Sequence, residues 1–254
     1  MFHFNAPVPT PGSAQDPPLA SLPRLARGQL HEVHASADDW ASALFFALVA
    51  VEAQAPRPLL LLRVRKDKAR AGSVVMPPCG EGWLNLGLDP ARLVIVDAKD
   101  DAGMLRAGLD AAREGGLGAV LMESWGNLRE YDLVSSRRLI LAAERSGIPV
   151  VLLRGDADPC ASAAHTRWTV ASAPSVPLDG HAPGHPALRV ELTRRRGGPA
   201  GQCWRLEWSE EHGVFRPAPL EELVVSEAER PAPPSGAVAV LPAVRERAPL
   251  RRTA

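Results

Sequence analysis

Apolar and polar positions along the chain change their period several times between residues 28 and 154. Short continuous apolar runs, which are typical of strands buried on both faces, occur at Leu59–Leu62, Leu93–Val96, Ala119–Met122 and Ile148–Leu153. A further short strand is expected at Gly28–His34. Apolar residues at helical spacing predict helices over Trp40–Val51, Asp100–Arg113 and Asp132–Gly147. This alternation predicts a mainly parallel sheet covered by helices on both faces.

Local signals refine two of the predicted helices. Ser36 or Asp38 is a candidate N-cap for the helix that begins at Trp40. In the helix that ends at Gly147, one side is apolar and is expected to be buried. Its members are Leu133, Val134, Leu139, Ile140 and Ala143.

After residue 160, the period of the pattern changes to two. Alternating segments, separated by Pro-rich or Gly-rich turns, occur at Thr166–Val170, Leu188–Thr193 and Cys203–Trp208. Residues 196–199 form a hairpin loop between the last two segments. We therefore expect an antiparallel extension of the parallel core, with Trp168, Trp204 and Trp208 in its interior.

Proline and small polar residues are concentrated at both ends of the chain. Such segments bury too little apolar surface to offset the entropic cost of ordering them. The sequence therefore predicts a disordered segment over residues 1–23, a folded domain over residues 24–215 and a flexible Pro-rich tail over residues 216–254.

Charge and cysteine content exclude several classes of protein. The 254 residues carry 29 Lys and Arg against 29 Asp and Glu, so any contact with nucleic acid must come from a local basic patch. The three cysteines lie far apart without metal-ligand spacing, which indicates reduced thiols and no metal site. The N-terminus lacks the pattern of a secretory signal, and no apolar run is long enough for a membrane span. We expect a soluble, cytoplasmic protein.

Five motifs occur in an order that is more specific than any one of them. They are Gly28-x-x-His-Glu32, Gly87-Leu-Asp-Pro-x-Arg-Leu-Val-Ile-Val96, the helix from Asp132 to Gly147, Thr166-Arg-Trp168, and Arg189–Gly198 followed by Trp204-x-Leu-Glu-Trp208. In this order, over roughly residues 25–215, the chain resembles the ImuA family of bacterial SOS-regulon proteins, sometimes labelled SulA-like or RecA-like. The resemblance implies a RecA-like core.

A RecA-like core implies a position for a nucleotide site, which can be compared residue by residue. The phosphate-binding loop corresponds to His34–Ser42, which contains neither the glycine nor the lysine that bind phosphates. Asp38 and Asp39 stand where phosphates would lie, and Ser42 is the remaining hydroxyl. Glu123 keeps a carboxylate at the strand end that would face Mg²⁺.

The position of the acidic residue that activates water in RecA corresponds to residues 63–66, which are mostly cationic. Because these parts of the phosphoryl-transfer machinery are absent or altered, we expect ATP hydrolysis to be lost. The chain is then not an enzyme, has no catalytic residue and binds no cofactor. Only a vestigial site is expected, near Asp38, Asp39, Ser42 and Glu123.

Candidate contact residues lie in three places. Arg137 and Arg138 are on the clearest helix and form either a solvated face or a surface for an anionic partner. The cluster Arg194–Arg196 is placed at a hairpin tip, where solvation and contact with DNA or an acidic protein are equally open readings. Trp125 follows a strand end and is either packed in a loop or exposed as a binding hot spot. The predicted contacts are Arg137, Arg138, Arg194, Arg195, Arg196 and Trp125.

His31 and Glu32 are adjacent on a predicted strand, so their side chains point to opposite faces and cannot act together on one substrate atom. A structural role for Glu32, accepting hydrogen bonds from the backbone or from arginine, is favoured over acid–base chemistry.

Taken with the resemblance, these features predict a non-catalytic RecA-like accessory protein in SOS-induced, error-prone translesion DNA synthesis. The resemblance implies as partners an ImuB-type polymerase-like adaptor and an error-prone replicative-type polymerase. RecA and a weak DNA contact are further candidates. Two alternatives remain open, namely a divergent RecA-like ATPase and a SulA-like cell-division inhibitor.

Overall fold

The computed structural model of the chain describes residues 22–51, 56–64, 79–85 and 87–218. The predicted disordered segment 1–23 lies outside the described residues except for Leu22 and Pro23. The predicted tail lies outside them beyond Ala218, and so do Arg65 and Lys66 of the cationic stretch after the second strand.

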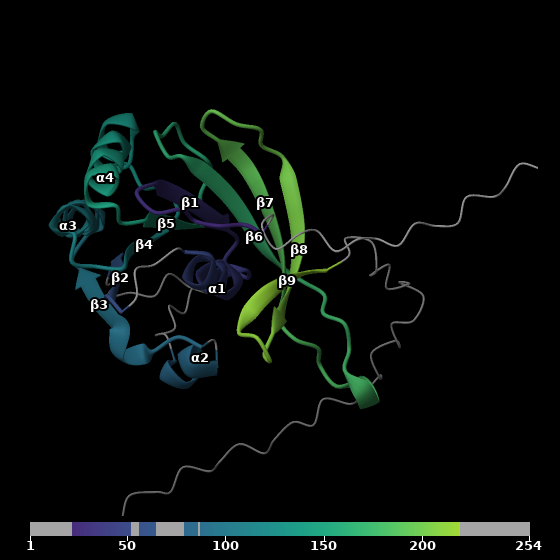
Figure 1. Ribbon diagram of the computed structural model, residues 1–254. Coiled ribbons are helices and arrows are strands. Elements are labelled where there is room, and N and C mark those ends of the chain that lie inside the picture. The colour runs from purple at the N-terminus through teal and green to yellow at the C-terminus, as the bar shows by residue number, and fades with distance from the viewer. Residues whose placement is uncertain (1–21, 52–55, 65–78, 86, 219–254) are drawn as a thin grey trace, which may run out of the picture. The chain divides into compact units, whose positions relative to one another are not determined.

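The described residues form a sheet of nine strands in the order β3-β2-β4-β5-β1-β6-β7-β8-β9 (Figure 1). The strands are β1 (Leu30–Ala35), β2 (Leu59–Val64), β3 (Leu93–Ala98), β4 (Ala119–Trp125), β5 (Val150–Gly155), β6 (Thr166–Ala173), β7 (Ala187–Arg195), β8 (Gln202–Ser209) and β9 (Val214–Ala218). The α-helices are α1 (Trp40–Ala50), α2 (Gly80–Asn85), α3 (Asp101–Glu114) and α4 (Leu133–Ser146), with short 3-10 turns at Pro90–Arg92 and Asp179–His181.

Strands β3, β2, β4, β5, β1 and β6 pair in parallel, and β7, β8 and β9 continue the sheet in antiparallel fashion. The predicted architecture, a mainly parallel α/β core extended by antiparallel strands, is confirmed. Strand β6 joins the two parts, because it pairs in antiparallel fashion with β7, as expected, and in parallel with β1 from His31↔Thr166 to His34↔Thr169. Its period of two reflects one covered face and one exposed face.

Alternate residues of the central strands pack into two separate cores. Leu59 and Leu61 lie on the face covered by α1, in a cluster that includes Phe46. Leu60 and Leu62 lie on the opposite face with α3 and α4. Figure 1 shows this arrangement, with α1 on one side of the sheet and α3 and α4 on the other. Because both faces of these strands pack into a hydrophobic core, their sequences are continuously apolar.

The first core continues across the antiparallel strands. Trp168 and Trp208 are buried there, as predicted, and Trp204 is partly buried against the same cluster. Strand β9 was not predicted, and it carries the ordered sheet through Ala218, past the expected domain boundary at residue 215.

Two apolar predictions were wrong about burial. Strand β3 is the edge of the described sheet, and Val94, Ile95 and Val96 are 37–44% exposed. Leu133 and Val134 lie on the outer side of α4 instead of its buried side. A continuous apolar run, or an apolar pair in the first turn of a helix, does not reveal whether another element covers it.

Helix ends follow the local signals in α4 and depart from them in α1. Asp132 caps α4 by accepting a hydrogen bond from the Ser135 N–H, and Gly147 ends the helix in the left-handed region. The N-cap of α1 is Asp39, not Ser36 or Asp38, and its side chain makes no capping bond to the helix. The carboxylate of Asp39 instead accepts hydrogen bonds from Ser172 on β6.

Candidate functional site

Strands β1, β4 and β5 end side by side at one edge of the sheet. Ala35 and Trp125 are both in register with Gly155, the last residue of β5. Open parallel sheets bind ligands outside such carboxyl ends. This edge is therefore the position at which a nucleotide-binding site is to be sought.

The loop that joins β1 to α1 is closed by the chain's own carboxylates. The backbone N–H of Ala37 donates to Asp156 Oδ1 at 2.8 Å. Ser36 Oγ donates to Asp39 Oδ2 at 2.8 Å, and Asp39 Oδ1 accepts from both the N–H and the hydroxyl of Ser172, at 2.7 and 2.6 Å. In a phosphate-binding loop, such backbone donors would face the anion.

Both carboxylates are held in place by the backbone around them. Asp156 has a backbone φ of 46°, a value that residues other than glycine rarely adopt, and its N–H donates to the Ala35 carbonyl. Partial burial alone would raise the pKa of the Asp39 carboxyl, but the hydrogen bonds from Ser172 and Ser36 lower it below its usual value. Asp39 is therefore ionised at neutral pH.

Two tryptophans occupy the space beside this loop. The rings of Trp40 and Trp125 lie with centroids 4.4 Å apart at an interplanar angle of 43°. Trp125 also lies directly on the backbone of Gly155, where an added Cβ would come within 2.6 Å of Trp125 Cε3. Of the two sequence interpretations of Trp125, the structure therefore supports packing within the loop region, with part of the ring left exposed.

Trp125 links the loop to the charged end of β4 and its neighbours. Its Nε1–H donates to Glu123 Oε1 at 3.1 Å. Burial raises the pKa of the Glu123 carboxyl, although Trp125 and the charge of Arg63 act in the opposite direction. Arg63 Nε donates to Asp97 Oδ1 at 2.8 Å across strands β2 and β3, so the cation beside Glu123 is paired with a carboxylate. Among the described residues, no group of His, Cys, Asp and Glu side chains has the geometry of a metal site.

The structure links two of the four residues predicted for the vestigial site. Asp39 and Glu123 are linked through the Trp40–Trp125 pair, while Asp38 is exposed on the loop and Ser42 is half-buried on α1. Sequence reasoning missed Asp156, Ser172 and Trp40. Asp156 follows the end of a parallel strand, a position that could have been flagged in the same way as Trp125, whereas no local signal marks Ser172 as a partner of Asp39.

The predicted contact arginines are divided between two distant surfaces. Arg137 and Arg138 are exposed on α4. Arg194 and Arg195 are the last residues of β7, and Arg196 starts the turn. Arg194 is half-buried and donates to the Ser162 carbonyl at 2.9 Å, so it is partly structural, while Arg195 and Arg196 are exposed.

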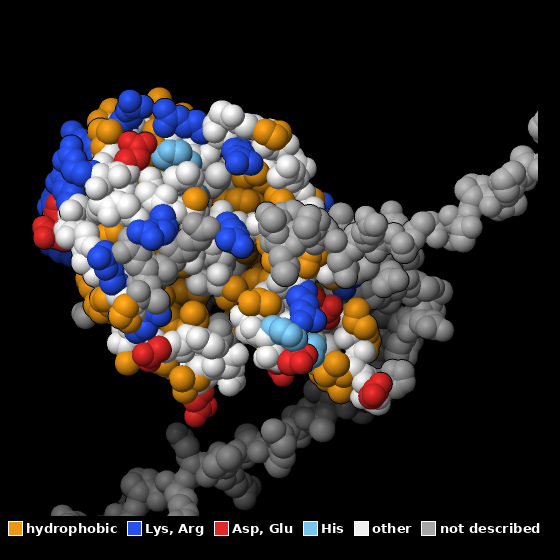
Figure 2. Space-filling model, in the orientation of Figure 1, with side chains coloured by type: hydrophobic (Ala, Val, Ile, Leu, Met, Phe, Trp, Pro, Cys, Tyr) orange, Lys and Arg blue, Asp and Glu red, His pale blue; other side chains and the backbone are white. Residues whose placement is uncertain are grey.

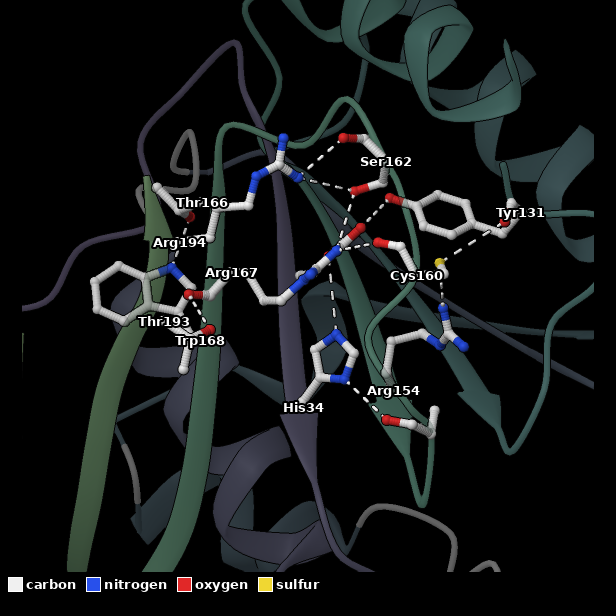
Figure 3. A network of polar contacts seen from close by, with 12 residues as sticks. His34, Tyr131, Arg154, Cys160, Ser162, Thr166, Arg167, Trp168, Thr193 and Arg194 are labelled. Atoms are coloured by element: carbon white, nitrogen blue, oxygen red, sulfur yellow. Dashed lines mark hydrogen bonds and ion pairs between the residues drawn. The ribbon is translucent and has the colours of Figure 1, made fainter. Parts of the chain in front are cut away.

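A second polar cluster lies on the opposite face of the sheet, around the fully buried Glu32. Tyr131 donates to Glu32 Oε1 at 2.6 Å and Arg167 Nε donates to Glu32 Oε2 at 2.5 Å. Figure 3 shows Tyr131, Arg167 and His34 converging, and Arg167 also donates to the carbonyl of Cys160. The expected structural role of Glu32 as an acceptor for arginine agrees with these contacts.

The same cluster holds Glu32 ionised. Burial would raise the pKa of the Glu32 carboxyl, but the hydrogen bonds from Arg167 and Tyr131, together with the neighbouring His34 and Ser162, lower it to about 2. On the other face, His31 Nδ1 lies 2.7 Å from Thr166 Oγ1 and Nε2 lies 2.9 Å from the Ala26 carbonyl. Burial lowers the pKa of His31 to about 4, so the ring is neutral at neutral pH. His31 and Glu32 thus serve different cores, as their adjacent positions predict.

Over 140 residues, this chain is 40% identical to Protein ImuA of Caulobacter vibrioides, both in strain NA1000 / CB15N and in strain ATCC 19089 / CIP 103742 / CB 15. The resemblance to the ImuA family is confirmed. The match covers 51% of this chain and 55% of the relative, so the activity and partners of the whole protein are matters for proposal.

No protein-family model matches this ImuA-like chain. The crystal structure of the RadB recombinase aligns with 73% of this chain and 89% of its own, with a TM-score of 0.45 and 13% identity, values that carry no conclusion. None of the described helices is long and apolar enough to cross a membrane.

The packing of Trp125 on Gly155 yields a direct test of the site. Gly155→Ala is expected to push the Trp125 ring away from Trp40 and to lower the free energy of unfolding by about 1–3 kcal/mol. Intrinsic tryptophan fluorescence and urea unfolding would measure both effects. Gly116→Ala is the matched control, because no heavy atom lies within 4 Å of the added Cβ. Equal behaviour of the two variants would contradict the packing described.

The two shifted groups on β1 predict a stability that falls on acidification. Between about pH 6.5 and 4, His31 binds protons in the unfolded chain before it does so in the folded one, so stability decreases as the pH falls. Glu32 extends the loss from about pH 4.5 toward 2. In His31→Gln, the free energy of unfolding is expected to change less between pH 6.5 and 4, with a residual slope from His165, whose pKa burial also lowers. Urea unfolding at a series of pH values measures this, and an unchanged slope would disprove the role of His31.

Proposed function

We propose that this ImuA-like chain is a non-catalytic RecA-like accessory protein in DNA-damage-induced, error-prone translesion synthesis, and that it acts through contacts with other proteins. The observation that carries the proposal is the carboxylate of Asp156, which accepts the Ala37 N–H at the position where a phosphate-binding loop would present donors to a nucleotide. A carboxylate of the chain itself thus takes the position that a bound anion would have at this loop.

Electrostatics reinforce the closure of the loop. Asp39 and Asp156 place two negative charges at the loop that joins β1 to α1, where Asp156 accepts the Ala37 N–H and Asp39 accepts from Ser172 on β6. Arg63, the cation beside Glu123, is paired with Asp97. An incoming nucleotide would therefore meet like charge at close range without a compensating lysine, which opposes both binding and phosphoryl transfer.

The outer surface of α4 supports a role in protein contacts. Leu133, Val134 and Leu141 are 55%, 60% and 49% exposed, beside the exposed Arg137 and Arg138. Figure 2 shows Lys and Arg side chains gathered over α3 and α4. Apolar side chains next to arginines on a rigid helix are suited to a partner with a carboxylate-rimmed apolar patch. The partners implied by the family resemblance are an ImuB-type polymerase-like adaptor, an error-prone replicative-type polymerase and RecA.

Nucleotide titration tests the closed site. ATP, with and without Mg²⁺, is expected to leave the tryptophan fluorescence and the thermal midpoint unchanged, because Asp156 already accepts the Ala37 N–H of the loop. The readout is sensitive, since a ligand at 100 times its Kd would stabilise the fold by about 2.7 kcal/mol. Trp40 and Trp125 lie beside the loop and serve as internal reporters. Saturable stabilisation by ATP would overturn the proposal in favour of a divergent ATPase.

Charge reversal on α4 tests the partner surface. Arg137→Glu with Arg138→Glu is expected to reduce capture of the polymerase-like adaptor by at least about tenfold, because charged hydrogen bonds at an interface are worth about 1.5–3 kcal/mol each. The measurement is a pull-down of the co-expressed adaptor, combined with the damage-induced mutation frequency. Arg189→Glu with Arg216→Glu, on strands β7 and β9, makes the same charge change on exposed residues away from α3 and α4 and serves as the control. Equal capture by both double variants would remove α4 from the interface.

A further inference from the structure

A groove lies at the end of the sheet opposite the closed loop. It is lined by residues before β1, by the start of β6, by the end of β7 and by the start of β8, and its volume is about 850 Å³. Ligand pockets usually measure about 300–1,000 Å³, so this groove is large enough for a ligand of several rings.

The rim of the groove is cationic. Arg24, Arg195 and Arg196 line it, together with His165, and no aspartate or glutamate is among its described lining residues. Within the described part of the chain, Arg195 and Arg196 form no ion pair with a carboxylate. The stem of Arg195 lies against the turn at Gly198, where an added Cβ would come within 3.1 Å of Arg195 Cδ. The turn therefore holds this guanidinium at the groove.

The floor of the groove is aromatic and apolar. Trp168 and Trp204 lie with ring centroids 5.8 Å apart, and Leu192 lines the same wall. Trp168 is anchored by the hydrogen bond of its Nε1–H to Thr166, and Trp204 is partly exposed. Figure 2 shows hydrophobic side chains in a hollow below the upper ends of strands β6 and β7. A ring fixed by a buried neighbour is a rigid platform for another flat group.

Amide side chains complete the lining. Gln29 and Gln202 each offer both a hydrogen-bond donor and an acceptor, which suits the edges of nucleobases. The cationic surface also continues past the groove. Arg27 and Arg145 are exposed where β1 begins and α4 ends. Glu144, which precedes Arg145, has its Oε1 3.7 Å from His165 Nε2.

We propose that this groove binds a short stretch of single-stranded nucleic acid, with Arg195 and Arg196 on the phosphates and a base stacked on Trp204. The combination of a cationic rim that extends along the surface with an aromatic floor is the general design of sequence-tolerant single-strand sites. An acidic peptide would use the arginines but would leave the amides and the aromatic floor without flat partners, so nucleic acid is favoured.

The choice of polymer rests on the proposed role in DNA damage, but the site and its test are independent of it. The assay contains neither nucleoside triphosphate nor protein partner. Binding of ATP would refute the proposed function and leave the groove intact. Failure of the oligonucleotide to bind would refute the groove and leave the proposed function intact.

Fluorescence anisotropy with a labelled oligo-dT and the full chain tests the proposal. Arg195→Gln with Arg196→Gln is expected to weaken binding by at least about tenfold at low salt. It is also expected to reduce the slope of log K against log salt by about 1.4, because each phosphate contact on a single strand contributes about 0.7. Trp204→Ala is expected to weaken binding about tenfold or more with little change in that slope, and Trp204→Phe is expected to restore it.

Arg106→Gln with Arg113→Gln on α3 is the matched control and is expected to retain wild-type affinity and slope. Circular dichroism and urea unfolding establish that each variant is folded. Three results would overturn the proposal. These are equal losses in the groove and control variants, equal affinity for a duplex of the same length, and equal affinity for poly-glutamate, which would assign the groove to an acidic protein.

Discussion

One buried carboxylate, Glu32, holds together parts of the chain that are far apart in sequence. It lies on the central strand β1 and accepts hydrogen bonds from Arg167 of the next strand and from Tyr131 of the segment before α4. An ionised carboxylate is stable in this position only because each of its oxygens has a donor, and removing one donor would leave a buried charge unpaired. The parallel core, the antiparallel extension and the loop before α4 are therefore fixed by the same group.

This arrangement separates the two ends of the sheet. At the carboxyl end of β1, the chain places its own anions on its backbone donors, through Asp156 on Ala37 and through Asp39 on Ser172. At the amino end, cations gather around a groove without carboxylates among its described lining residues. A formal net charge of zero therefore does not mean a uniform surface, because the two ends of the sheet carry opposite local charges.

Much of the architecture could be predicted from the sequence, because periodicity reports which face of an element is apolar. The strands β1 to β5, the helices α1, α3 and α4 and the burial of Trp168 follow from it. Periodicity does not report which other strand or helix lies next to an element. It did not place β3 at an edge, and it did not show that β6, which is antiparallel to β7, also pairs in parallel with β1, because that pairing joins residues more than 100 positions apart.

The site shows the same limit more sharply. The sequence alone identifies what is missing from the loop, since glycine and lysine are absent from His34–Ser42. It does not identify what replaces them. Asp156 accepts the Ala37 N–H because β5 lies next to β1, and it does so from a backbone with the unusual φ of 46°. Loss of a binding motif and occupation of the vacated donors are distinct steps, and the second stabilises the fold by satisfying a backbone donor that would otherwise have no partner in the chain. On the proposed function, restoring the glycine and lysine of the motif alone is expected to give no nucleotide binding, because Asp156 would still accept the Ala37 N–H.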